Sequence, residues 1–224
     1  MPRKQPVLAN TVIITHQSTV LDRHLAPPLL GLWVFLLGTS SVFIGLFLAF
    51  ALTFNQFQAS FASAAEARSA VPVAVNGGLL LAAGLAVARA MLAHKRHQQG
   101  PISGCLGIAL LALMGYITAR LHGYYRAYQA GLVSFGDRPF TFGGPSPHDA
   151  LLFFNFHFAL STLHTLLVLL GALALGAMML DSADRRQPAR FDARLTAAGV
   201  YVSFLILVWL GLFFAFFLSG RFYT

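Results

Sequence analysis

Five long apolar stretches, separated by short polar segments, dominate the pattern of residues along this chain. A transmembrane helix needs about 20 apolar residues, because each residue adds about 1.5 Å along the helix axis. The stretches that qualify cover residues of about 29–54, 70–93, 102–124, 149–180 and 195–218. The pattern therefore predicts an all-α membrane protein, in which a polar arm at residues 1–28 precedes a bundle of five transmembrane helices at 29–219.

The composition supports this interpretation, because the chain is 57% hydrophobic and only 10% charged. A soluble domain carries about 25% charged residues. The net charge of +8 does not indicate binding to nucleic acid, since the basic residues lie in short loops between the apolar stretches. The single cysteine, Cys105, excludes a disulfide within the chain, a covalently attached c-type haem and a thiolate zinc or iron–sulfur centre.

The distribution of Lys and Arg predicts the orientation in the membrane, because cytoplasmic loops are enriched in both. One side would carry nine basic residues, namely Arg3, Lys4, Arg23, Lys95, Arg96, Arg185, Arg186, Arg190 and Arg194. The other side would carry four, namely Arg68, Arg126, Arg138 and Arg221, or five if Arg120 is added. We therefore predict that the N-terminus is cytoplasmic and the C-terminus outside.

Small residues at four-residue spacing indicate where helices approach closely in lipid. In the second span this stripe consists of Gly78, Ala82, Ala86 and Ala90. The fifth span has few small residues and many phenylalanines, so we expect it to face lipid or a large apolar partner.

Ionisable groups within a span usually mark a function. His157 and His164 lie on one face of the fourth span, about 10 Å apart along its axis, so they cannot share one metal or haem iron. Either each histidine hydrogen-bonds to a neighbouring helix or a lipid headgroup, or one of them binds haem b together with a histidine of another span. A small permease is a further alternative, although the middle of every span lacks Asp and Glu. The sequence predicts no catalytic residue, no cofactor-binding residue and no metal site in this chain.

Most of the chain from about Pro28 onward resembles subunit III of the haem-copper oxidases. Residues 30–36 read Leu-Gly-Leu-Trp-Val-Phe-Leu, and with Phe43 and Gly-Leu-Phe at 45–47 they are similar to the family pattern W-V-F-L…F-x-G-L-F. Phe153-Phe154, Leu163-His164 and Gly171 are similar to F-F…F-H-G-L-H-V…G. Residues 201–213 follow Y-W-H-F-V-D-V-V-W-L-F-L-F without a gap.

The chain departs from this family at most of the family's polar positions. Thr39 stands where the family has a membrane-buried Glu, and the family's Gln-x-x-Glu falls near His122 and Tyr125. The His and Asp of the last span are replaced by Ser203 and Ile206. The apolar frame is kept, so the chain resembles a divergent, five-helix bacterial member.

The resemblance implies a non-redox accessory subunit of a haem-copper terminal oxidase, in the aerobic respiratory chain of a bacterial inner membrane. Such a subunit stabilises the catalytic subunit I, contacts the other oxidase subunits and binds phospholipid. Haem and copper would belong to the partner subunits. The resemblance also implies lipid or partner contacts at Trp33, Thr39, His157, His164 and Trp209.

Overall fold

The computed structural model describes residues 27–98, 100–133, 139–144, 146–181 and 188–218, and this part of the chain is helical without a strand. Its long helices are α2 (Pro27–Gln56), α4 (Ala70–Lys95), α5 (Gly100–Gln129), α6 (Pro147–Asp181) and α7 (Pro188–Phe213). Each is long and apolar enough to cross a membrane, with α7 continuing through η1 (Phe214–Leu218). The predicted all-α membrane protein with five spans is therefore confirmed. The predicted arm lies almost wholly outside the described residues.

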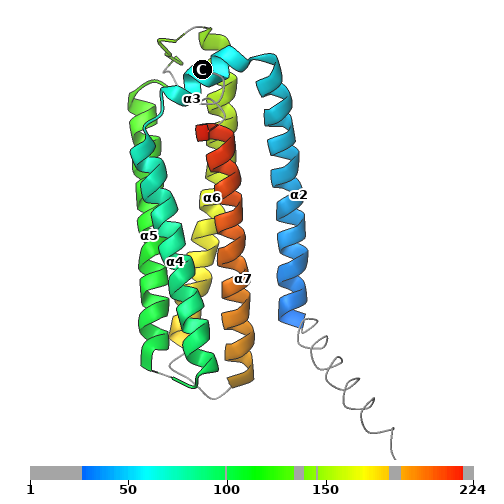
Figure 1. Cartoon of the computed structure of the whole chain (residues 1–224), viewed down its shortest axis with the longest axis vertical. Helices are drawn as coiled ribbons and strands as arrows, with labels where there is room; N and C mark the ends of the chain where they lie inside the picture. Colours follow the sequence, from blue (N-terminus) through cyan, green and yellow to red (C-terminus); the bar gives the residue numbers. More distant parts are fainter. Residues whose placement is uncertain (1–26, 99, 134–138, 145, 182–187, 219–224) are drawn as a thin grey trace, which may run out of the picture. The chain divides into compact units, whose positions relative to one another are not determined.

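Four of these helices pack together side by side (Figure 1). α4 lies against α5 and α7, and α6 lies against the same two helices. Their shared core consists of fully buried aliphatic side chains such as Leu80, Leu106, Leu113, Leu160 and Leu205. Close packing of such side chains holds helices together in lipid, where the hydrophobic effect between helices is weak.

Glycines allow α7 to approach its neighbours closely. A Cβ atom added to Gly77 would overlap the ring of Trp209, and one added to Gly84 would come within 2.7 Å of Ile206. The predicted stripe of small residues in α4 was therefore partly wrong, because Gly78 has nothing within 4 Å of such an added atom. Successive residues at four-residue spacing drift around a helix of 3.6 residues per turn, so a straight stripe does not follow one contact face.

A short helix that the sequence did not predict, α3 (Gln58–Glu66), lies against α6 and η1. Its Phe61 side chain is fully buried. The Phe61 ring lies 5.7 Å from that of Phe50 and 5.5 Å from that of Phe153, and Phe50 lies 4.7 Å from Phe216. This aromatic cluster joins α3, α6, η1 and the last turns of α2. The part of α2 up to Thr39 belongs to a separate compact unit.

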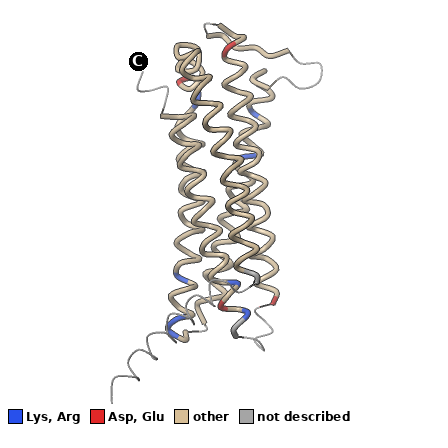
Figure 2. The backbone as a smooth tube through the Cα atoms, turned by 90° about the vertical axis from the view of Figure 1, so that its right-hand side faces the viewer, with Lys and Arg blue, Asp and Glu red and all other residues tan. Residues whose placement is uncertain are grey.

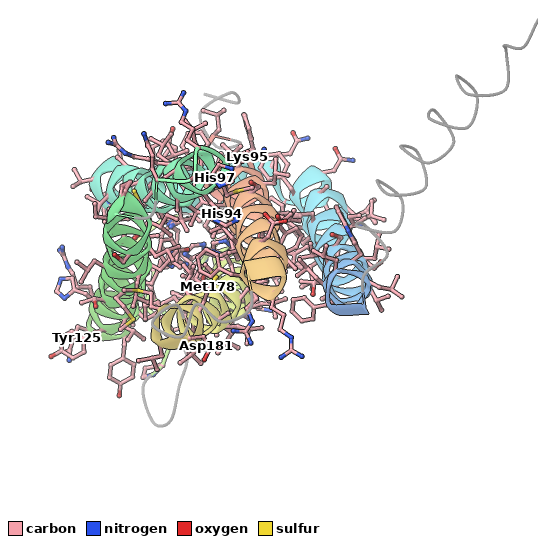
Figure 3. All side chains as sticks on the ribbon, turned by 90° about the horizontal axis from the view of Figure 1, so that it is seen from below. His94, Lys95, His97, Tyr125, Met178 and Asp181 are labelled. Atoms are coloured by element: carbon pink, nitrogen blue, oxygen red, sulfur yellow. The ribbon has the colours of Figure 1, made fainter. Side chains whose placement is uncertain are left out.

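Charged residues lie mostly near the helix ends, and the long middle portions of the helices carry few of them (Figure 2). His94, Lys95 and His97 lie at the end of the bundle that also holds Asp181 at the last residue of α6 (Figure 3). The last residues of α4 and α6, which precede the two connections predicted to be cytoplasmic, thus lie at one end of the bundle. Which membrane face this end meets stays a prediction.

Candidate functional site

Buried polar side chains gather along one face of α6. They are His157, Ser161, His164 and Thr165, and none of them is more than 8% exposed. Their spacing of four, three and one residues places them on the same side of a helix. α6 therefore turns a polar stripe toward the inside of the bundle rather than toward lipid.

His164 connects three helices through both of its ring nitrogens. Its Nε2 lies 3.0 Å from the carbonyl oxygen of Leu205 in α7, and its Nδ1 lies 2.8 Å from the hydroxyl oxygen of Tyr116 in α5. A carbonyl oxygen only accepts, so Nε2–H donates to Leu205 and Nδ1 accepts the hydroxyl proton of Tyr116. With no exposed surface and both nitrogens engaged, His164 acts as a structural link. This is the neighbouring-helix alternative of the sequence analysis.

A second polar group surrounds Tyr124 in α5. Its hydroxyl donates to Ser161 Oγ at 3.1 Å and lies 3.4 Å from Thr165 Oγ1. Arg120 Nη2 donates to this hydroxyl at 3.4 Å, and the Arg120 guanidinium lies 5.1 Å from the centre of the Tyr124 ring. These contacts hold Arg120 inward, whereas the sequence analysis only counted it as a possible fifth basic residue of one membrane side.

Arg68 enters the bundle from the junction between α3 and α4. Its Nη1 donates to His157 Nδ1 at 3.3 Å and to the backbone oxygen of Phe216 at 3.4 Å. Burial and, secondarily, the charge of Arg120 lower the pKa of Arg68 from its usual range to about 10, so the guanidinium stays charged at neutral pH. Arg68 was counted from the sequence as a loop residue, yet it is tied to α6 and η1.

These groups border a partly open cavity of about 50 Å³ within the bundle, with Arg68, Asn76, Tyr116, Arg120, His157 and Trp209 in its lining. That volume is several times the roughly 10–15 Å³ that one water molecule needs. The Nε of Arg120 and the Oδ1 of Asn76 are buried without a hydrogen-bond partner among the described residues. None of the described residues that line the cavity is an Asp or Glu. The cavity is thus cationic and holds unused hydrogen-bonding groups.

The residues expected to contact lipid or a partner occupy different surroundings. Trp33 is 44% exposed and Thr39 is partly exposed on the separate unit that ends at Thr39. The structure brings His157 and Trp209 together at the cavity, while His164 is enclosed by helices of this chain. Lipid or partner contact at these positions stays a prediction.

The sequence analysis missed Arg68, Arg120 and Asn76 as parts of one site. Arg120 lies nine residues before Gln129, the last residue of α5, which is about 14 Å along the axis. The predicted third span ended at about residue 124, four residues after Arg120, so this depth was not visible in the sequence.

No protein-family model matches this sequence, and no curated protein is significantly similar to it. The likeness to oxidase subunit III therefore remains a resemblance in the motifs of individual spans.

Proposed function

We propose that this chain is a non-redox accessory subunit of a haem-copper terminal oxidase, which stabilises the catalytic subunit and binds phospholipid in the inner membrane of an aerobic bacterium. The proposal starts from the motifs of the first, fourth and fifth spans, which are similar to those of subunit III. Five apolar spans fit the size of a short member of that family.

The observation that carries the proposal is the hydrogen bonding of His164, a residue of the fourth-span motif. Both of its ring nitrogens hold helices together, to Tyr116 in α5 and to Leu205 in α7. A haem iron needs one imidazole nitrogen, so ligation would break one of these buried bonds. The haem b alternative is thereby disfavoured at His164, and a packing role is favoured.

The outward faces of the helices support a chain that packs against other apolar surfaces. Large exposed side chains include Leu85 at 73% and Leu111 at 73%. On α7 and η1 they include Leu207 at 66% and Phe214 at 57%. Such faces suit lipid tails or the helices of a catalytic subunit, in which haem and copper would reside.

A permease that couples transport to protons usually needs a carboxylate in the middle of a span, and the described acidic residues of α6 do not supply one. Asp149 lies in the first turn of α6 and Asp181 is its last residue, so these described carboxylates of α6 lie at its ends. Asp149 accepts a hydrogen bond from Ser60 in α3 at 3.3 Å and thereby takes part in the packing of α3.

Deletion of the gene tests the proposal in the native organism. We expect membranes of the deletion strain to lose cytochrome oxidase stability, measured as a lower thermal midpoint of the haem spectrum and a lower rate of oxygen uptake. Re-expression of the chain should restore both. Unchanged haem content, stability and oxygen uptake in the deletion strain would contradict the proposal.

A further inference from the structure

The cavity contains two cations that the described residues leave without an anion. Arg68 and Arg120 line the same cavity, and burial together with the like charge of Arg120 lowers the pKa of Arg68. Burying a charge is costly unless an opposite charge or several hydrogen bonds compensate it. His157, Asn76 and Tyr116, which share the lining, are uncharged or basic, so none of them neutralises the pair.

The donors of both guanidinium groups are only partly used. Each guanidinium carries five N–H groups. The described hydrogen bonds of Arg68 use only Nη1, and those of Arg120 use only Nη2. The buried Arg120 Nε has no partner among the described residues. Arg68 and Arg120, which both retain unused N–H donors, therefore line the same space.

The size and charge of this space select the chemistry of its occupant. A cation is repelled, and an apolar group would leave the guanidinium donors unpaired. A planar or tetrahedral anion with two or more oxygens accepts parallel hydrogen bonds from guanidinium groups. A cavity volume of about 50 Å³ is of the order of the size of one such group.

We propose that this cavity binds one oxyanion group, a phosphate or carboxylate, between Arg68 and Arg120. The oxygens accept hydrogen bonds from both guanidinium groups, which line the cavity. The partly open side of the cavity allows the group to belong either to a free ion or to the headgroup of a lipid whose tails stay outside. The lipid-headgroup form of this site deepens, and rests on, the phospholipid binding of the proposed function. The test uses this chain alone, so its failure would leave the oxidase-subunit role untouched.

Trp209 provides the signal for the test, because it lines the cavity and the chain holds only one other tryptophan, Trp33. The full-length Trp33→Phe variant, purified in a neutral maltoside detergent, is titrated with inorganic phosphate at constant ionic strength. A second titration uses phosphatidylglycerol, with diacylglycerol of the same chains as a control that lacks the phosphate. We expect a saturable change of Trp209 fluorescence with phosphate, phosphatidylglycerol or both, and none with diacylglycerol.

Replacement of the guanidinium tests whether the site itself gives this signal. Arg120→Gln keeps a donor for the Tyr124 hydroxyl and removes the repulsion of Arg68, so this variant should fold. We expect its dissociation constant for the ligand to be at least tenfold higher than that of the parent. Arg126→Gln is the matched control, because Arg126 is an exposed arginine of the same helix. Its affinity should equal that of the parent.

The two titrations distinguish the sources, since a response to phosphatidylglycerol alone identifies a lipid headgroup and a response to phosphate identifies a free ion. As a second readout, the ligand should raise the thermal midpoint of the parent protein, because binding to the folded state stabilises it. The absence of a saturable response to either ligand would overturn the proposal. An unchanged affinity in Arg120→Gln would overturn it as well.

Discussion

The hydrogen bond between Tyr116 and His164 gives the most specific prediction about the bundle. Tyr116→Phe removes the hydroxyl and keeps the ring, which is 1% exposed and lies edge-on to His164 at 5.6 Å. His164 Nδ1 is then left without a partner, in a side chain with no exposed surface. A buried unsatisfied group costs about 1–3 kcal/mol in soluble proteins, whereas interhelical hydrogen bonds in a membrane protein average about 0.6 and reach about 1.7. We therefore expect a loss of about 1–2 kcal/mol in the free energy of unfolding.

The assay is reversible unfolding by sodium dodecyl sulfate in mixed micelles, followed by tryptophan fluorescence. Tyr125→Phe is the matched control, because Tyr125 is 61% exposed and points outward from α5 (Figure 3). It should change the free energy by less than about 0.5 kcal/mol. A cycle that combines Tyr116→Phe with His164→Phe should give a coupling energy of about 1 kcal/mol. Equal stability of the Tyr116→Phe and Tyr125→Phe variants would refute the role assigned to His164.

The remaining predictions concern the packing and the orientation of the helices. Gly77→Ala should lower the free energy of unfolding by about 1–3 kcal/mol, because the new methyl group overlaps Trp209. Gly78→Ala should be neutral or stabilising, because nothing lies near its added methyl group. Thermal melts of the two purified variants, compared with the parent, check this pair, and similar melts would contradict the packing of α4 on α7. A cysteine at Gln98 in a Cys105→Ala background should be protected from a membrane-impermeant maleimide in intact cells, whereas one at Ser146 should be labelled. The reverse labelling pattern would contradict the predicted orientation.

The number and approximate place of the spans could be predicted from the sequence, because hydropathy over about 20 residues suffices to identify a helix in lipid. The contact faces could not, since nearly every position of α4 is apolar and its pattern does not distinguish Gly77 from Gly78. The short α3 was missed because its one large apolar side chain, Phe61, gives no periodic signal. The packing of α3 on α6 is decided by contacts distant in the sequence.

The candidate site was only partly visible in the sequence. The sequence placed His157 and His164 within a span. It could not decide between a hydrogen bond to a neighbouring helix and ligation of haem b, because that choice depends on the partners of the ring nitrogens. Arg68 and Arg120 were counted as charges of one membrane face, because each lies within reach of a helix end. Their convergence on one cavity depends on the junction between α3 and α4 and on the inward position of Tyr124, which no local pattern encodes.

The central claim is that the chain serves a haem-copper oxidase without carrying its cofactors. Purification of the tagged chain from its native membrane in a mild detergent, followed by an optical spectrum and mass spectrometry of the co-eluting proteins, tests this claim most directly. We expect a haem-copper catalytic subunit to co-elute in a near one-to-one amount. When the complex is dissociated, the haem absorbance should stay with that subunit, and this chain should be colourless. A chain that elutes alone, or one that keeps a Soret band after the other subunits are removed, would contradict the claim.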